Sequence, residues 1–410
     1  MINLYIFNET SRAAVYGIGT YIRELLDALK DSNVKVCIVH LRAENPKKTS
    51  TEETDNIQQW YFPPPLINNN TLDWRSQTKL YYRNIVYLLK LQIKDTDQMV
   101  FQLNYNQSEK LAEELKRVFY CKIVTVIHYN NWGFSIYDNL PRLKKALNEE
   151  SEENLKKTVE DEKLLYTKSD RVVCLTNYMH EILCCDYGLD SAKISFIPNG
   201  LSDIAESKPH FKLLRKKWNV PVREKIILFA GRMDEIKGLI YLIKAFREVL
   251  KVYPNCRLVI AGNGSFDRYT KESKDIYTKI TYTGLLDKPQ LYELYCLANI
   301  GVVPSLFEPF GYVAVEMMMH RLPVVVTETS GLNEIVDDNC GLKVPLTKLP
   351  DNVEIDTMLL SEKILYLLQH PSEAKKKGRN GRKRYLKEYS SEVFRKNMLE
   401  FYQSLFNNDK

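Results

Sequence analysis

Two glutamates, Glu308 and Glu316, lie eight positions apart in the segment NIGVVPSLFEPFGYVAVEMMMHRLPVVVTE, residues 299–328. The alternation of apolar runs, breakers and helix formers predicts a strand, a loop, a helix and a second strand. Carboxylates in such a loop and helix can bind sugar hydroxyls. Because the chain has 52 acidic residues, this spacing also arises by chance.

The loop enters the predicted helix through Phe310, Gly311 and Tyr312. A helix begins with free backbone N–H groups and the positive end of its dipole, so this junction suits a phosphate. Glu316, about one turn into the helix, can reach sugar hydroxyls beside that phosphate. The competing interpretation is ordinary capping by an acidic residue.

Two cations follow the apolar segment KIILFAG, residues 225–231. Arg232 and Lys237 lie between Gly231 and Gly238, on a predicted loop at the carboxyl end of a strand. Paired cations on such a loop can hold a diphosphate, whose charge grows as it leaves. The alternative is two ordinary surface cations.

Three residues in the first half of the chain lie at the carboxyl ends of predicted strands. Gly17 and Gly19 form a predicted turn directly before a helix, a geometry that lets backbone approach a diphosphate or sugar. His128 ends the strand-like segment KIVTVIH and can donate a hydrogen bond to a sugar hydroxyl or carry a proton. Glycines are common in such turns, and most histidines are structural.

Strand and helix patterns alternate along both halves of the chain, which predicts an α/β fold with two mostly parallel sheets covered by helices. Ligands of such sheets bind at the carboxyl ends of the strands. A polar, basic stretch after Gly200 places the domain boundary near 200–222. Predicted strands cover residues 34–41, 98–103, 122–128, 170–176, 193–198, 225–231, 256–264, 279–284 and 341–346.

The predicted helices include residues 78–93, 108–118, 143–167, 240–253, 288–298 and 391–406. Residues 60–74, rich in aromatic, proline and asparagine residues, are interpreted as a loop near the substrate, with a long surface excursion as the alternative. Residues 375–387 carry eight basic residues and no acidic one, so they are either a solvated face or a contact with anionic lipid.

Composition is that of a globular protein of two or three domains: 410 residues, 44% apolar, net charge +6. That charge does not argue for nucleic acid, so no nucleic-acid partner is expected.

The eight cysteines contain no CxxC pair and several lie in apolar segments, which indicates free thiols in a reducing compartment. With no apolar segment of membrane-spanning length and no signal-like start, the expected location is the cytoplasm, with possible peripheral contact at the inner membrane face.

Together these motifs resemble the retaining nucleotide-sugar transferases of glycosyltransferase family 4. The resemblance rests on E-x7-E at Glu308 and Glu316, on the glycine-bounded Arg232 and Lys237, and on His128. It extends to Gly17-Ile18-Gly19, Pro198-Asn199-Gly200, Gly262-Asn263-Gly264 and Thr283-Gly284.

The resemblance implies the GT-B fold: an N-terminal acceptor-side Rossmann-like domain (residues 1–205), a donor-binding domain (206–390) and a final helix (391–410) that returns to the first domain. It implies that Glu316 binds ribose, that Arg232 and Lys237 hold the diphosphate, and that Glu308 holds the sugar. The implied catalytic residues are Glu308, His128, Arg232 and Lys237. The implied donor site comprises Gly17, Gly19, Arg232, Lys237, Gly262, Thr283, Gly284, Phe310, Gly311, Tyr312, Val313 and Glu316.

The implied activity is transfer of a sugar from a nucleoside-diphosphate donor, with a UDP-sugar favoured, to a hydroxyl acceptor with retention at the anomeric carbon. No metal or other cofactor is expected, because cations and helix dipoles take the role of a divalent ion. Two alternatives remain: a nucleotide-sugar epimerase or hydrolase on the same fold, and a non-catalytic nucleotide-sugar-binding subunit. The sequence departs from the family at Tyr129, because an aspartate frequently follows the histidine in that family, and residues 42–110 match no motif. The acceptor therefore stays open. The oligomeric state is also open, since no motif bears on it.

Overall fold

The structure, a computed structural model, describes residues 1–9, 17–44, 48–54, 57–65, 73–148, 152–205 and 211–407. The chain falls into two compact units, each considered by itself. Unit 1 comprises Met1–Asn131, Glu149–Gly200 and Ser391–Lys410, and unit 2 comprises Trp132–Asn148 and Leu201–Ser390. The predicted loop over residues 60–74 lies partly outside the described residues, since these omit 66–72.

Unit 1 is built on one sheet whose strands pair in the order β3-β4-β2-β1-β5-β6-β7-β8. The pairs are parallel except β3 with β4, which form an antiparallel edge. The central strands are apolar and buried along their length, as expected for a parallel sheet covered on both faces. The strands are β1 (Ile2–Glu9), β2 (Val34–Leu41), β3 (Ser50–Thr54), β4 (Ile57–Tyr61), β5 (Met99–Leu103), β6 (Lys122–Ile127), β7 (Arg171–Cys174) and β8 (Ile194–Phe196).

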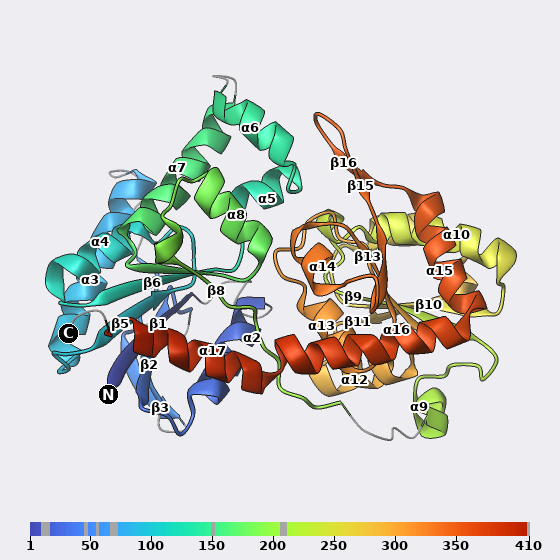
Figure 1. Cartoon of the computed structure of the whole chain (residues 1–410), viewed down its shortest axis with the longest axis horizontal. Helices are drawn as coiled ribbons and strands as arrows, with labels where there is room; N and C mark the ends of the chain where they lie inside the picture. The colour runs from blue at the N-terminus through green and yellow to red at the C-terminus, as the bar shows by residue number, and fades with distance from the viewer. Residues whose placement is uncertain are drawn as a thin grey trace. The chain divides into compact units, whose positions relative to one another are not determined.

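Helices from both ends of the chain cover this sheet (Figure 1). The last helix, α17, packs against α2, and Arg395 donates a 2.8 Å hydrogen bond to the carbonyl of Lys30. In the interior the Tyr402 hydroxyl of α17 donates to Gln102 Oε1 of β5 at 2.5 Å. In the described part of unit 1 the α-helices are α2 (Gly17–Leu29), α3 (Trp74–Gln92), α4 (Glu109–Val118), α7 (Glu153–Lys168), α8 (Asn177–Cys185) and α17 (Ser391–Ser404).

The Tyr402→Phe variant is expected to destabilise unit 1 by about 1–2 kcal/mol, because it leaves the buried Gln102 carbonyl without this donor. Differential scanning calorimetry of the full chain measures the shift. Tyr120→Phe is the matched control, since Tyr120 is 86% exposed and its change is expected to leave the transition within experimental error. Equal shifts for the two variants would contradict the buried hydrogen bond.

Unit 2 contains a wholly parallel sheet in the order β11-β10-β9-β12-β13-β14, with a separate antiparallel hairpin of β15 and β16. The register places Ala230, Ala261 and Gly284 side by side, so the loops after β9, β10 and β11 leave the same edge. The strands are β9 (Lys225–Ala230), β10 (Cys256–Ala261), β11 (Ile280–Gly284), β12 (Ile300–Val303), β13 (Val324–Thr327), β14 (Gly341–Val344), β15 (Leu346–Lys348) and β16 (Val353–Ile355).

The core of unit 2 lies between this sheet and helices such as α10 and α15, which contact each other. A capping box between Asp287 and Gln290 fixes the start of α12. The α-helices of this unit are α5 (Asn131–Ile136, whose first residue belongs to unit 1), α6 (Leu140–Asn148), α9 (Phe211–Lys217), α10 (Leu239–Val252), α11 (Phe266–Glu272), α12 (Lys288–Leu297), α13 (Tyr312–Met319), α14 (Ser330–Ile335), α15 (Thr357–Gln369) and α16 (Pro371–Arg384).

Three sequence predictions differ from this architecture. Residues 132–148, assigned to the N-terminal domain, group with unit 2, because Asn139 Nδ2 donates to the Leu349 carbonyl at 2.8 Å and Lys348 Nζ to the Asp138 carbonyl at 2.9 Å. The single helix predicted over 143–167 is wrong, since α6 ends at Asn148 and α7 begins at Glu153. The units divide after Gly200, five residues before the predicted boundary. Within the described ranges no helix is long and apolar enough to cross a bilayer.

Candidate active site

Glu308 lies in the loop between β12 and α13, beside Lys237. Its Oε2 accepts hydrogen bonds from Lys237 Nζ at 2.6 Å and from Ser305 Oγ at 3.3 Å. Both charged side chains are mostly buried, with 15% and 20% of their surface exposed. The structure therefore joins two sequence-predicted residues that are 71 positions apart.

The segment from Glu308 to Gly311 is held by the start of α14. Gly331 N and Ser330 Oγ each donate to the Glu308 carbonyl at 2.9 Å. Gly311 is the N-cap of α13 and has φ +114°, a backbone conformation that favours glycine. The N–H groups of Tyr312 and Val313 lie in the first turn, where a helix makes no i−4 bonds of its own, so the predicted junction of loop and helix is present, and phosphate binding there stays a prediction.

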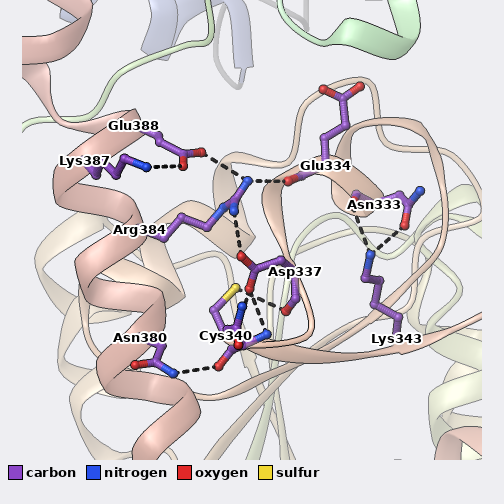
Figure 2. Close-up of polar contacts among 10 residues, drawn as sticks. Asn333, Glu334, Asp337, Cys340, Lys343, Asn380, Arg384, Lys387 and Glu388 are labelled. Atoms are coloured by element: carbon purple, nitrogen blue, oxygen red, sulfur yellow. Dashed lines mark hydrogen bonds and ion pairs between the residues drawn. The ribbon is translucent and has the colours of Figure 1, made fainter.

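A partly exposed ion pair follows α14. Figure 2 shows Arg384 of α16 reaching the carboxylate of Asp337, at 2.7 Å, and the carbonyl of Glu334, at 2.8 Å. Another cation of the basic stretch, Arg382, pairs with Asp203. Part of the run at 375–387 therefore holds unit 2 together.

The loops after β9, β10 and β11 form a closely packed floor. Gly231 N donates to the Ala261 carbonyl and Gly262 N to the Gly284 carbonyl, both at 2.9 Å. Gly262 has φ +153°, and a Cβ there would lie 1.8 Å from the Gly231 carbonyl oxygen. Glycine at 262 is thus required by packing between loops.

Gly238 closes the loop that carries both cations. It has φ +65°, and a Cβ there would lie 1.8 Å from the carbonyl oxygen of Pro304, the residue after β12. This contact brings Lys237 to the Glu308 loop. Arg232, the other cation of this loop, forms an ion pair with Asp234, whose Oδ2 lies 3.0 Å from its guanidinium.

Glu316 is buried inside unit 2, with 1% of its side chain exposed. Its carboxylate accepts from the Tyr295 hydroxyl at 2.9 Å and forms a short ion pair with Lys288. Sequence reasoning missed both partners, which lie on α12. The sequence carries a signal for the start of α12, Asp287 followed by Pro289 and Gln290, but none for its contact with α13.

Thr283 and Gly284 end β11 at the same edge of the sheet as the cation loop. Thr283 Oγ1 donates to the Gly284 carbonyl at 2.9 Å, whose oxygen also accepts from Gly262 N. Phe310 is buried, and its ring meets the Tyr312 ring edge-on at a centroid distance of 5.2 Å. All predicted donor-site residues of the C-terminal half thus lie in unit 2, on the loops that follow its strands, at the end of β11 or on α13.

Gly17, Gly19 and His128 belong to unit 1. The prediction that the two glycines form a turn before the helix is wrong, because α2 already begins at Gly17 and both lie in its first turn. The first turn still carries N–H groups without i−4 partners, so the chemistry proposed for these glycines is unchanged. The preceding residues, 10–16, lie outside those described.

His128 lies at the end of β6 against the ring of Tyr21, with centroids 4.6 Å apart. Its Nε2 is 3.1 Å from Asn104 Oδ1, which also accepts from Gln102. Asn104 Nδ2 donates to the Phe7 carbonyl, so Oδ1 is the acceptor and His128 Nε2 carries the hydrogen. This arrangement leaves Nδ1 as the unprotonated ring nitrogen.

Burial lowers the pKa of His128 to about 3, so we expect its imidazole to stay neutral above about pH 4. The unfolded chain takes up this proton near pH 6.5, so acidification below that value lowers the free energy of unfolding by about 1.4 kcal/mol per pH unit through this residue. NMR of the labelled ring tests the prediction. A titration midpoint near 6.5 in the folded protein would contradict it.

Sequence reasoning also missed Glu162, a buried carboxyl of α7. It accepts hydrogen bonds from Asn131 N at 2.7 Å, from Asn106 Nδ2 at 3.1 Å and from the Tyr187 hydroxyl at 2.6 Å. Burial raises the pKa of Glu162 to about 7. Glu162 therefore supports the segment that follows His128, and its helical spacing from Val159 and Tyr166 is the signal that places it on the buried face.

Comparison with known proteins places this site in a family. Residues 210–384, which carry Arg232, Lys237, Glu308 and Glu316, match the model described as "Glycosyl transferases group 1". This part of the chain is a group 1 glycosyltransferase domain. The family resemblance predicted from the sequence is therefore confirmed.

Individual relatives agree with this assignment. An uncharacterized glycosyltransferase of Methanocaldococcus jannaschii is 33% identical over 193 residues, which are 45% of this chain and 49% of the relative. A D-inositol 3-phosphate glycosyltransferase of Pseudarthrobacter chlorophenolicus is 26% identical over 339 residues, 78% of this chain and 76% of the relative. The match to the Methanocaldococcus protein spans 49% of that relative's length. The match to a mannosylfructose-phosphate synthase of Agrobacterium fabrum spans 44% of its length, so the chain spans about half the length of these two relatives.

Solved structures extend the likeness to the whole chain at the level of fold. Sucrose-phosphate synthase from Thermosynechococcus elongatus has a TM-score of 0.76 at 22% identity, with both chains fully covered. Anabaena HepE in complex with UDP and glucose has a TM-score of 0.72 at 15% identity, covering 98% of this chain and all of the other. The predicted GT-B fold class, with two Rossmann-like domains, is confirmed.

Proposed function

We propose that this glycosyltransferase moves a sugar from a nucleoside-diphosphate sugar to a hydroxyl acceptor and retains the configuration of the anomeric carbon. The observation that carries the proposal is the pair of Glu308 and Lys237, set beside the amino end of α13. A cation and free N–H groups suit a diphosphate, and a carboxylate held beside them suits a sugar hydroxyl.

In this proposal Arg232 and Lys237 stabilise the diphosphate as the bond from the anomeric carbon to its oxygen lengthens. An oxocarbenium-like sugar forms, and the acceptor hydroxyl attacks from the face that the diphosphate leaves. The leaving phosphate oxygen takes the acceptor proton. Glu308 positions the sugar and is not a covalent nucleophile.

Glu316 is assigned to the ribose hydroxyls. Its carboxylate is already held by Lys288 and Tyr295, so two partners fix its orientation before a donor arrives. His128 is assigned to the sugar near the reacting carbon, as a neutral hydrogen-bonding group, because burial keeps its pKa low. We expect transfer to persist in EDTA, because the cations Arg232 and Lys237 and the backbone N–H groups at the start of α13 take the role that a divalent ion has in other transferases.

The donor is tested with UDP-, GDP- and ADP-sugars in thermal-shift and product-release assays. A UDP-sugar is the first to try, because HepE has been solved with UDP and glucose in the same fold. We expect one donor to raise the melting temperature and to release its nucleoside diphosphate only when a hydroxyl acceptor is present. An altered sugar formed from donor alone would instead indicate an epimerase or hydrolase, and binding without transfer to any acceptor a non-catalytic subunit.

A further inference from the structure

Helix α3 of unit 1 carries apolar side chains on two sides. Tyr81, Tyr82, Ile85, Val86 and Leu89 are buried. On the opposite side Leu80, Tyr87, Leu88 and Leu91 are 45%, 48%, 41% and 67% exposed. Their spacing puts them on one face that runs for about 16 Å along the helix. We call these four residues the α3 stripe.

A groove of about 400 Å³ continues the α3 stripe beside the helix. Leu80 and Leu88 form one wall, and Phe62, Pro63 and Pro65, which follow β4, form the other. Single exposed apolar residues are ordinary, but a continuous stripe joined to an apolar groove marks a binding surface.

The charge of α3 restricts what can bind. The helix sequence WRSQTKLYYRNIVYLLKLQ contains four basic residues and no acidic one. Lys79 and Lys90 are exposed beside the α3 stripe, and Lys94 follows the helix end. Arg117 of α4 lies against the Tyr87 ring, but it pairs with Glu114, as does Arg83 of α3, so the lysines are the cations of this surface.

We propose that the α3 stripe docks unit 1 on an anionic lipid surface. Leucine and tyrosine side chains enter the boundary of the bilayer, and the flanking lysines meet anionic headgroups. A second copy of this chain fits less well, because an α3-to-α3 contact would bring together two helices whose charged residues are all basic. The proposal rests on the surface of unit 1 and is independent of the proposed sugar transfer.

Two other basic surfaces fit a bilayer less well. On α16, Arg382 and Arg384 are held in ion pairs with Asp203 and Asp337. On α9, Phe211 and Leu213 are exposed, but the helix has only seven residues, and its Arg215 and Lys217 bind within unit 2. α9 therefore supplies a control.

The test is co-sedimentation of the full chain with vesicles of phosphatidylcholine alone or of an equal mixture with phosphatidylglycerol. The wild type is expected to bind the mixed vesicles more tightly and to be released by high salt. The L88E/L91E double variant is expected to bind at least about tenfold more weakly, because two apolar side chains leave the lipid. K79E/K90E is expected to lose roughly thirtyfold, at about 1 kcal/mol for each lysine.

The matched control is Leu213→Glu, which alters a leucine on α9 that is 66% exposed, close to the 67% of Leu91, and is expected to bind like the wild type. Circular dichroism and melting temperature should be unchanged in every variant, since all five positions are exposed. The proposal is overturned by a wild type that ignores both vesicle types, or by a loss in Leu213→Glu with none in L88E/L91E. It is also overturned if light scattering shows a dimer that L88E/L91E abolishes while vesicle binding is absent.

Discussion

Replacing Lys237 with methionine is expected to lower kcat about 10²–10³-fold, the usual effect of removing one group that stabilises charge in a transition state. Methionine keeps the length of the side chain but removes the ammonium group that lies 2.6 Å from Glu308. Because the diphosphate gains charge as it leaves, the loss should appear in kcat more than in KM. Steady-state kinetics with a confirmed donor measures it.

The control for this variant is Lys251→Met, which removes a lysine that is paired with Glu248 on α10 and is largely exposed. Its kinetic constants are expected to match those of the wild type. Because Lys237 and Glu308 touch, Glu308→Gln and the double variant should show a non-additive loss. Wild-type kcat in a folded Lys237→Met protein would contradict the role given to the pair.

Gly262→Ala is expected to destabilise unit 2 by at least about 3 kcal/mol, because the new Cβ overlaps backbone and the φ angle is strained. The Cβ would lie 1.8 Å from the Gly231 carbonyl oxygen, so the loop that carries Arg232 must move. The variant should therefore also weaken donor binding. Calorimetry of the full chain gives the shift of the unit 2 transition, and titration with donor gives the affinity.

Gly284→Ala is the matched control for the packing effect. Gly284 also has a positive φ, +73°, but a Cβ there meets no atom within 4 Å. We expect it to cost only about 1–2 kcal/mol, the penalty of the left-handed backbone alone. Equal destabilisation by the two alanines would show that the close approach of Gly262 to Gly231 does not restrain the loops.

Much of the fold could be predicted from local patterns. Strands were recognised because a buried parallel strand has a short, continuous run of apolar residues. The predicted strand 34–41 has the observed bounds, and the strands predicted over 122–128 and 225–231 each end one residue earlier than predicted. The E-x7-E unit was predicted with its loop and helix in order, since Pro309 and Gly311 mark the loop and good helix formers follow.

The parts that sequence missed depend on contacts between distant segments. Nothing near Glu316 indicates that Lys288 and Tyr295 of α12 hold its carboxylate. The sequence predicted Lys237 and Glu308 as site residues, but for the same reason it did not predict that they form an ion pair. The order of the strands and the packing of α17 against α2 also depend on tertiary contacts, which a local sequence pattern does not reveal.

The most direct test of the account is the configuration of the product, read by proton NMR after transfer from an α-linked nucleoside-diphosphate sugar to a hydroxyl acceptor. The account predicts an α-linked product, formed at least about tenfold more slowly by Arg232→Ala and by Glu308→Gln. A β-linked product, or full transfer by both variants, would contradict it.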